Sequence, residues 1–540
     1  MRKPIFFNLK QKLLDWSPIL ILSTVLLLHA PLYSSFWLDE AITAWLIFLP
    51  ENGLVLESLR WQAQSPLYFY ILSKWVRLFG NSPNELGQEY EYVLRLFSLV
   101  CFILSLLVAT LLVKRLVNHF SSSLKKKYNN RLGILTCVIL ISSEDLLRAA
   151  FSARPYSIAF LCSLLSTLFF LKLISNPRKV IFCAYVISLL LTYYFHYLFI
   201  GVAIVHLVIL ILCLRSNDIC YQNRGTIVSY VTSSWSITIV GMIPGLAHQL
   251  QWSVIVDKAL DSIYLKSIGY RLLNLTISRQ FFVYIPVTLI LVGLIHINNW
   301  MPKKWWLELK SFVKRDISII AIMFLLAPLL LLLGASLLLG HSLLISRYAL
   351  WGTIGVAIFM VSLILPFSYT SALTTAIWVW SGFASTFEMQ RKWHIEDWRD
   401  AASYVKEYVS KNNLNHRQVS VFINSGLRES NSVSYLSDKN AWPYLSVPFT
   451  VYLPQVNLIP IPTKLVDADS SNNDELLVKS LLPQPHAPSE AHHVFIAFPK
   501  SFSQLIYQKI DVINKQKDIG SFKICDKASF GLVNLLRVCT

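Results

Sequence analysis

Residues 317–338 read ISIIAIMFLLAPLLLLLGASLL and contain no Asp, Glu, Lys or Arg. A helix of this length extends for about 33 Å at 1.5 Å per residue, enough to cross the ~30 Å hydrocarbon core of a bilayer. We therefore predict a transmembrane helix here, and this prediction sets the fold class for the sequence around it.

The rest of the chain repeats this pattern. Of its 540 residues, 55% are hydrophobic and 14% are charged, against about 25% charged in ordinary soluble proteins. This composition excludes a soluble globular protein, and the many aromatic residues exclude a disordered one. Further apolar runs lie at 17–35, 92–113, 132–147, 155–171, 180–195, 197–214, 226–247, 281–299, 344–366 and 369–387. We predict a polytopic α-helical membrane protein with about 11 transmembrane helices.

The distribution of basic residues predicts how the chain is oriented. Most of the net charge of +18 lies in the segments predicted to face inward, at 1–16, 114–131, 172–179, 215–225 and 300–316. This is the positive-inside pattern of membrane proteins, and it accounts for the charge without nucleic-acid binding. We predict a multi-pass plasma (inner) membrane protein with an uncleaved first span, a cytoplasmic N-terminus and an extracytoplasmic C-terminal domain.

Two large blocks outside the spans are predicted to share the outer face. In the outer loop 36–91, the segments Leu54–Trp61 and Leu67–Phe79 have helical spacing and many aromatic residues, typical of helices at the membrane interface. The transmembrane domain takes up residues 1–390, and residues 391–540 are predicted to form a small α/β domain. A disulfide between Cys525 and Cys539 in that domain stays open.

The second block mixes helical and strand patterns. The expected elements are helices at Asp397–Ser410, Ser430–Ser437 and Phe502–Lys515, with strands at Val419–Ile423, His493–Ala497, Ser521–Cys525 and Gly531–Val538.

Acidic pairs follow two of the predicted spans on the outer side. Asp39 and Glu40 come directly after the first span, and Glu144 and Asp145 lie in the next outer loop. Carboxylates at a membrane surface can act as a general base or hold a cation. The alternatives are a solvated helix N-terminus for the first pair and ion pairing within the loop for the second.

Cationic and aromatic residues lie on the same predicted face. Arg347 lies at the predicted outer start of a span. Its planar guanidinium group suits a phosphate. The alternative is that the side chain only extends toward the membrane interface. Arg154, Lys74 and Arg77 are further cations. His196 lies within the aromatic run Tyr193–Tyr197, which suits a sugar ring, although a structural histidine is the alternative.

Several motifs resemble the GT-C membrane glycosyltransferases, which include protein mannosyltransferases and lipid A aminoarabinose transferases. The resemblance covers about 15–405, and Gln64-Ser65 replaces the His or Pro found before Pro-Leu-Tyr in many relatives. The motifs are Phe36-Trp37-Leu38-Asp39-Glu40-Ala41, Gln64-Ser65-Pro66-Leu67-Tyr68-Phe69, Ala153-Arg154-Pro155-Tyr156-Ser157, Ser346-Arg347-Tyr348 and Asp397-Trp398-Arg399-Asp400.

The resemblance implies an inverting enzyme that moves a sugar from a polyprenyl-phosphate donor to a lipid, glycan or protein acceptor at the outer face. It implies that Asp39 is the general base, that Glu40 assists it, and that Glu144 or Asp145 completes an acidic site. The cations implied at the donor phosphate are Arg347, Arg154, Lys74 and Arg77. The residues implied at the substrate are Tyr68, His196 and Tyr197. No cofactor is certain. A divalent cation, Mg²⁺ or Mn²⁺, held by Asp39, Glu144 and Asp145 stays open.

Two other classes of protein are kept as alternatives. A lipid or saccharide transporter (flippase) would carry charges at mid-span and broken helices, whereas the charges here gather at the outer span ends. A non-catalytic envelope assembly protein would bind through its C-terminal domain, and its acidic pair would be dispensable.

Overall fold

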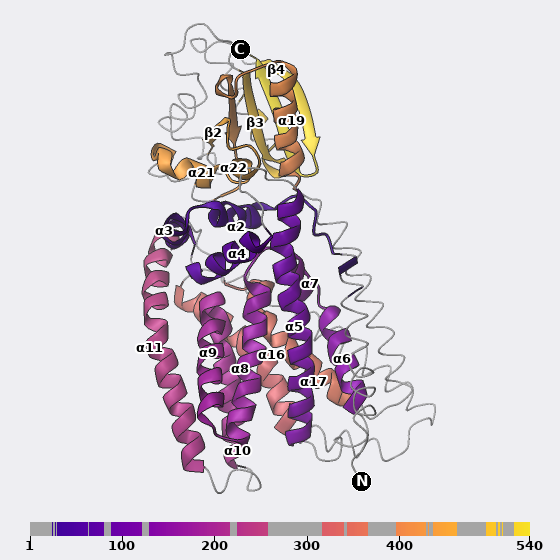
Figure 1. Cartoon of the computed structure of the whole chain (residues 1–540), viewed down its shortest axis with the longest axis vertical. Helices are drawn as coiled ribbons and strands as arrows, with labels where there is room; N and C mark the ends of the chain where they lie inside the picture. The colour runs from indigo at the N-terminus through magenta and orange to yellow at the C-terminus, as the bar shows by residue number, and fades with distance from the viewer. Residues whose placement is uncertain are drawn as a thin grey trace, which may run out of the picture.

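The computed structural model describes residues 30–62, 64–79, 88–120, 129–215, 224–257, 316–339, 343–364, 396–427, 436–461, 493–503 and 523–539, with a few isolated positions. Within these ranges the molecule consists of a helical bundle with an α/β unit at one end (Figure 1).

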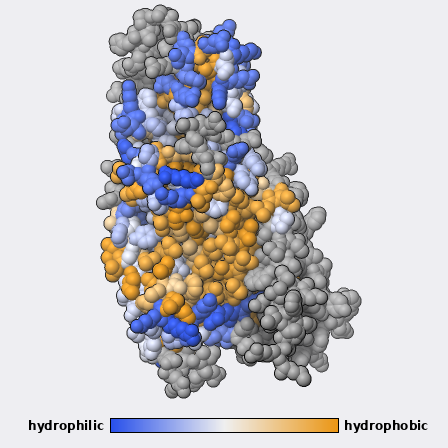
Figure 2. Space-filling view, viewed as in Figure 1, coloured by the Kyte–Doolittle hydropathy of each residue, from blue (hydrophilic) through white to orange (hydrophobic). Residues whose placement is uncertain are grey.

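The bundle is made of long apolar helices. They are α5 (Gln88–Phe120), α6 (Asn129–Ile141), α8 (Tyr156–Ser175), α9 (Lys179–Phe195), α10 (Val202–Arg215), α11 (Arg224–Asp257), α16 (Asp316–Leu339) and α17 (Thr353–Ile364). In the part of the chain that the structure describes, five helical segments are long and apolar enough to cross a membrane, at Glu89–Val117, Tyr156–Ser175, Tyr197–Arg215, Arg224–Gln249 and Asp316–Leu338. Figure 2 shows their outer surface as an apolar band between two polar ends. The chain is therefore an integral membrane protein.

Two of the predicted spans differ in detail from the observed helices. The apolar run at 132–147 is broken, because α6 ends at Ile141 and a separate helix, α7 (Glu144–Phe151), follows. The run at 344–366 begins with a 3₁₀ turn, η5 (Ser346–Gly352), before α17. The predicted spans 281–299 and 369–387, and most of 17–35, lie outside the described residues, so the count of about 11 stays a prediction.

Three short helices lie across the end of the bundle that faces the α/β unit (Figure 1). These are α2 (Leu38–Phe48), α3 (Glu51–Trp61) and α4 (Pro66–Leu78). The last two coincide with the predicted interfacial segments. Ser65 caps α4 by accepting a hydrogen bond from the backbone N–H of Leu67 at 3.2 Å, and Pro66 stands at its first position. Helix α2 was not predicted.

The α/β unit is built on a five-stranded sheet of order β2-β1-β3-β5-β4. Strands β1 (Val419–Ile423), β2 (Asn457–Pro460) and β3 (His493–Pro499) are parallel, and β5 (Val533–Cys539) joins β3 and β4 (Lys523–Phe530) in antiparallel fashion. Its apolar core includes Val421, Ile423 and Phe495 together with Trp398 and Val405 of α19 (Trp398–Lys411).

Several sequence-based elements match this unit and others do not. The helix predicted at Asp397–Ser410 and the strand at Val419–Ile423 have nearly those bounds, whereas β4 extends five residues beyond its predicted end. Strand β2 was missed. The helices predicted at Ser430–Ser437 and Phe502–Lys515 lie mostly outside the described residues. Cys525 in β4 is disulfide-bonded, and the backbone of Cys539 lies on the neighbouring strand β5.

Candidate active site

Asp39 lies in the first turn of α2, at the end of the bundle that faces the α/β unit (Figure 1). A carboxylate is favourable here because the unpaired N–H groups of a helix N-terminus carry partial positive charge. Its side chain is 25% exposed, so it is largely enclosed and still reachable by a ligand.

Two arginines from distant parts of the sequence converge on this carboxylate. The Nη1 atom of Arg347 lies 3.6 Å from Asp39 Oδ2, and the Nη2 atom of Arg154 lies 4.0 Å from the same oxygen. Arg154 also donates a hydrogen bond from Nη1 to the backbone carbonyl of Asp39 at 3.1 Å. The cluster therefore carries one more positive than negative charge.

Neither guanidinium is fully satisfied by protein groups. Among the described residues, the Nε atoms of Arg154 and Arg347 are buried and have no hydrogen-bond partner. Buried polar groups are nearly always paired in folded proteins. Unpaired guanidinium N–H groups beside a surplus positive charge suit an anion with several oxygens, such as a phosphate.

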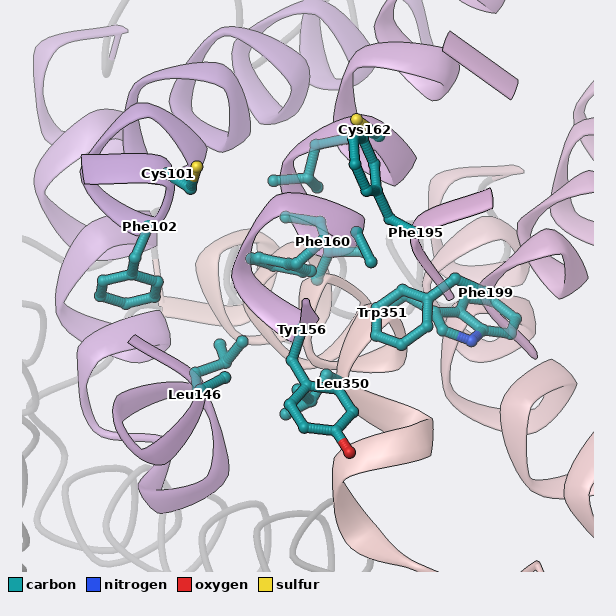
Figure 3. Packing of buried hydrophobic residues seen from close by; sticks show 14 of the residues in the cluster. Cys101, Phe102, Leu146, Tyr156, Phe160, Cys162, Phe195, Phe199, Leu350 and Trp351 are labelled. Atoms are coloured by element: carbon teal, nitrogen blue, oxygen red, sulfur yellow. The ribbon is translucent and has the colours of Figure 1, made fainter. Parts of the chain in front are cut away.

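Aromatic rings surround the guanidinium of Arg347. Its Cζ lies 5.8 Å from the ring centroids of Tyr156 and Tyr348 and 6.0 Å from that of Trp37. Figure 3 shows Tyr156 at the start of α8 near Leu350 and Trp351 of η5, the turn that carries Arg347. Burial raises the pKa of Tyr348 to about 12, so this hydroxyl stays protonated. The rings restrict the guanidinium through cation–π contacts.

His196 stands between α9 and the 3₁₀ turn η1 (Tyr197–Gly201), in contact with this cluster. Its ring lies 5.0 Å from that of Tyr348, 5.3 Å from that of Tyr156 and 5.5 Å from that of Tyr197. Burial, and then the charges of Arg347 and Arg154, lower the pKa of His196 to about 3. The imidazole is therefore neutral at physiological pH and can exchange a hydrogen bond with a ligand.

Glu40, the neighbour of Asp39, lies elsewhere. Its fully buried carboxylate accepts hydrogen bonds from Arg95 Nε at 3.0 Å and Nη2 at 2.5 Å, and from the backbone N–H of Ala153 at 2.8 Å. Arg95 also donates to the carbonyls of Ser34 at 2.5 Å and Ser35 at 3.0 Å. Protein groups enclose Glu40, and its expected role of assisting Asp39 stays a prediction.

The second acidic pair lies in the first turn of α7. Glu144 forms an exposed ion pair at 2.8 Å with Arg148, four residues later in the same helix. This pair matches the alternative prediction of ion pairing within the loop. Asp145 lies beside Glu144. Among the described residues, no group of three or more His, Cys, Asp or Glu side chains is arranged to hold a metal ion. The cation expected at Asp39, Glu144 and Asp145 stays a prediction.

The remaining predicted cations are also paired at the surface. Lys74 and Arg77 both bind the carboxylate of Glu51, at 2.5 and 2.7 Å. Their side chains are 46% and 51% exposed. They join α4 to α3, and their expected role at a donor phosphate stays a prediction.

Tyr68 and Tyr197 keep their places near the cluster. Tyr68 in α4 is fully buried against Phe69 and Phe97, and burial raises its pKa above the usual range. Tyr197 stacks on His196 with the ring planes 8° apart. Tyr68 is close enough to Arg154 for the guanidinium charge to oppose that rise in its pKa.

Sequence reasoning missed three residues that the structure brings into this region. Arg95 is a charge inside the predicted span 92–113, and an ionisable residue in an apolar run is itself a signal of function or of a buried partner. Trp37 and Tyr156 belong to motifs of the resemblance, but neither was predicted as a site residue. No sequence signal indicated that their rings face Arg347.

The bundle and this outer cluster define an integral membrane protein with a candidate reaction site of one carboxylate, two arginines and a neutral histidine. No protein-family model and no curated protein matches the chain. Among solved structures, it is similar to the crystal structure of ArnT from Cupriavidus metallidurans bound to undecaprenyl phosphate, with 12% sequence identity, 98% of each chain covered and a TM-score of 0.43.

Proposed function

We propose that this protein is a membrane glycosyltransferase that moves a sugar from a polyprenyl-phosphate donor to an acceptor at the outer face. The observation that carries the proposal is the approach of Arg347 and Arg154 to Asp39, at 3.6 and 4.0 Å. In the proposal Asp39 is the base and the two arginines bind the donor phosphate, at one end of an apolar bundle. Asp39 and the two arginines belong to motifs that resemble the GT-C glycosyltransferases.

In this proposal the displacement inverts the anomeric centre, as the resemblance to the GT-C glycosyltransferases implies. Asp39 removes the proton from the acceptor nucleophile as its oxygen or nitrogen attacks the anomeric carbon. The bond between that carbon and the phosphate oxygen breaks, and its electron pair leaves with the polyprenyl phosphate. The developing charge on the phosphate lies against Arg347 and Arg154, and such electrostatic stabilisation is commonly the largest catalytic contribution.

The enclosing rings make this charge stabilisation effective. Trp37, Tyr156 and Tyr348 exclude water from one side of the Arg347 guanidinium, and charge interactions strengthen as the local dielectric constant falls. The neutral His196 adds no third positive charge, so it can bind a hydroxyl of the sugar without competing for the phosphate.

Orientation follows from the same proposal. The basic turn that joins α8 to α9, with Arg178 and Lys179, lies at the end of the bundle opposite the α/β unit. We assign that end to the cytoplasm and the α/β unit to the outer side of the inner membrane. A cleavable reporter inserted at Pro177 should respond only to an inside probe, and one at Asn412 only to an outside probe. The same side for both would contradict the assignment.

The test of function is transfer of labelled sugar from undecaprenyl-phosphate glucose by the purified protein, with a membrane lipid extract as the source of acceptor. Asp39→Asn should lower transfer by about 100-fold or more, the scale of losing a general base. Arg347→Ala should nearly abolish it. Sugar transfer by Arg347→Lys should also fall at least ~10-fold, because an ammonium group cannot bind two phosphate oxygens in parallel as a guanidinium does.

The matched control is Arg148→Lys, which changes the exposed arginine of the Glu144 pair and should transfer as the wild type does. All variants are compared at equal amounts of folded protein. Full activity in Asp39→Asn would remove the base from the proposal. Equal rates for arginine and lysine at position 347 would remove the phosphate role, and movement of the labelled lipid across the membrane without transfer would favour a flippase.

A further inference from the structure

A small hollow adjoins His196, near the helices that lie across the end of the bundle. It has room for about one water molecule, and we call it the His196 hollow. Its lining comes from Gln64 and Ser65 before α4, residues 193–197 at the end of α9, and Gly245, His248 and Gln249 of α11. Three segments distant in the sequence therefore enclose a space too small for any ring-sized ligand.

Three buried polar atoms of this lining have no protein partner. They are Gln64 Oε1, the Tyr193 hydroxyl and His196 Nδ1, each unpaired among the described residues. Their residues are 9%, 3% and 1% exposed. Because buried polar groups are nearly always paired, three such atoms around one hollow indicate a bound group that completes their hydrogen bonds.

Three other polar side chains of the lining bond elsewhere. Ser65 Oγ accepts from the backbone of α4 at 3.2 Å, and the Tyr194 hydroxyl donates to a backbone carbonyl of α11 at 2.5 Å. His248 Nε2 lies 2.9 Å from a backbone carbonyl oxygen of α3. The atoms left for a bound group are therefore those of Gln64, Tyr193 and His196.

Close packing of α9 on α11 holds the Tyr193 hydroxyl at the hollow. A Cβ at Gly245 would lie 2.9 Å from that hydroxyl oxygen, so the absence of a side chain in α11 makes room for it. The bond of Tyr194 to the same helix fixes the end of α9. The hydroxyl is thus placed by the two helices and needs no bound group to bring it there.

The charges around the His196 hollow favour water over an ion. Its lining includes no Asp, Glu, Lys or Arg, and the positive charges of Arg154 and Arg347 already act on His196, so a cation is disfavoured. An anion would meet the Gln64 amide oxygen, which can only accept hydrogen bonds. A water molecule both donates and accepts, and a buried water typically makes about three hydrogen bonds.

A count of hydrogens decides how such a water is bonded. Three contacts join it to Gln64, Tyr193 and His196, and each contact uses one hydrogen. The water brings two hydrogens and the Tyr193 hydroxyl brings one, so all are used when Nδ1 of the neutral imidazole only accepts. A hydrogen on Nδ1 would be a fourth, and one buried hydrogen would then lack an acceptor, which is costly.

We infer that the His196 hollow holds one bound water, shared by Gln64, Tyr193 and His196, which keeps the imidazole proton on Nε2. Gln64 and Tyr193 are then positioning residues that act on His196 through the water. Because Nδ1 is engaged, Nε2–H is the group that His196 can offer to a ligand. The consequence for sugar transfer rests on the proposed function, in which this N–H donates to an oxygen of the bound substrate.

Solid-state NMR of the full chain in lipid, with isotope-labelled histidine, locates the proton. The signals of His196 among the 12 histidines are those missing from the spectrum of His196→Gln. At neutral pH the wild type should carry the proton on Nε2, with Nδ1 unprotonated and hydrogen-bonded. A proton on Nδ1 in wild type would overturn the inference.

Two substitutions test the water itself. Tyr193→Phe and Gln64→Met each remove one of its three bonds and nearly conserve side-chain volume. The water then stabilises the unprotonated Nδ1 less, so the fraction of His196 with its proton on Nδ1 should rise about 5-fold, the scale of one hydrogen bond. Either variant serves if the other does not fold.

The matched control is Tyr194→Phe, the same change one residue later in the same lining. Its hydroxyl bonds to α11, so the His196 signals should stay as in wild type. The inference is overturned if Tyr193→Phe and Gln64→Met leave those signals unchanged, or if Tyr194→Phe changes them as much as Tyr193→Phe does.

A high-resolution cryo-EM map of the protein in nanodiscs gives an independent readout. It should show one isolated peak within about 2.7–3.2 Å of Gln64 Oε1, the Tyr193 hydroxyl and His196 Nδ1, the range of hydrogen bonds. No peak, or a density larger than one water, would overturn the inference. Neither measurement needs transfer activity, so a failure of the proposed function appears separately, as wild type that binds the water and transfers no sugar.

Discussion

Two adjacent carboxylates serve different purposes in this protein. Asp39 lies beside Arg154 and Arg347, whereas Glu40 is fully buried and paired to Arg95. A buried ion pair contributes little net stability, but removing one partner leaves an uncompensated buried charge. At the scale of single residues, the Glu40–Arg95 pair therefore holds the loop that presents Asp39.

Glu40→Gln should lower the free energy of unfolding by about 3–5 kcal/mol, because Arg95 keeps its charge and loses its carboxylate. Denaturant titration of the protein in detergent measures this loss. Glu144→Gln changes the exposed partner of Arg148 and should cost less than ~0.5 kcal/mol. Similar losses in both variants would show that Glu40 is not the buried anchor described.

The neutral state of His196 predicts a pH dependence. Because its pKa is about 3 in the folded protein and about 6.5 in an unfolded chain, the unfolded state binds more protons between these values. The contribution to stability is complete above pH 6.5 and is lost as pH falls from 6.5 toward 3. Thermal unfolding from pH 7.5 to 4.5 should show this decline in wild type and a shallower one in His196→Asn. Equal slopes would contradict a buried neutral histidine.

At the scale of elements, close packing between helices places the arginine of η5. This turn leads directly into α17, and α17 packs on α16 through Gly355, where a Cβ would lie 2.6 Å from the backbone carbonyl oxygen of Ala321. Below that turn, a Cβ at Gly201 would lie 2.8 Å from the Trp351 ring. Glycines thus let α17 approach α16 and let η1 approach η5, and this packing fixes the turn that carries Arg347 next to Asp39.

Gly355→Ala should force α17 away from α16 and destabilise the protein by about 1–3 kcal/mol, as overpacking does. Size-exclusion chromatography after heating measures the shift in unfolding temperature. Gly334→Ala lies on α16, where a Cβ would meet nothing within 4 Å, and should leave stability unchanged or slightly raised. A neutral Gly355→Ala would mean that the two helices do not approach as closely as described.

At the scale of the whole molecule, the α/β unit is fastened to the segment that carries Asp39. The Tyr452 hydroxyl donates to Glu91 Oε1 at 2.6 Å and accepts from the backbone N–H of Phe36 at 2.8 Å. Arg399 donates to Glu91 Oε2, and its own N–H donates to the Ser35 hydroxyl at 3.1 Å. These bonds connect the unit to the residues just before α2.

A second contact joins the unit to α3 instead. Arg60 binds Asp438 at 2.9 Å, and Trp61 stacks on Tyr444 with centroids 4.2 Å apart. The two contacts lie on the same interface, and the first of them reaches the segment of Asp39. They can therefore be separated by experiment.

Tyr452→Phe should raise hydrogen exchange of the backbone over residues 33–41 by about 10-fold, because Phe36 N–H loses its acceptor and Glu91 loses a donor. Exchange mass spectrometry measures this segment directly. Asp438→Asn weakens the Arg60 pair on the same interface and should leave residues 33–41 unchanged. Faster exchange of that segment in both variants would indicate general loosening of the α/β unit.

The sequence by itself determined the class of this protein. Apolar runs such as 317–338 can be stable only in a membrane or a fully buried core. The helices at the outer end were predictable because α3 and α4 carry amphipathic spacing and a Ser-Pro start, which are local signals. Candidate residues Asp39, Arg154, Arg347 and His196 were likewise recognisable from their motifs.

Only the tertiary structure decided what each of those residues contacts. Adjacent positions in a helix point about 100° apart, so Asp39 reaches Arg347 while Glu40 turns into the bundle toward Arg95. Nothing in the dipeptide distinguishes the two acids. Likewise, Lys74 and Arg77 resemble Arg347 as outer cations, but folding brings Glu51 against them and leaves Arg347 beside a carboxylate within a ring of aromatic side chains. These contacts join residues that are distant in the sequence, from 23 positions for Lys74 and Glu51 to 308 for Asp39 and Arg347, and local sequence patterns do not encode them.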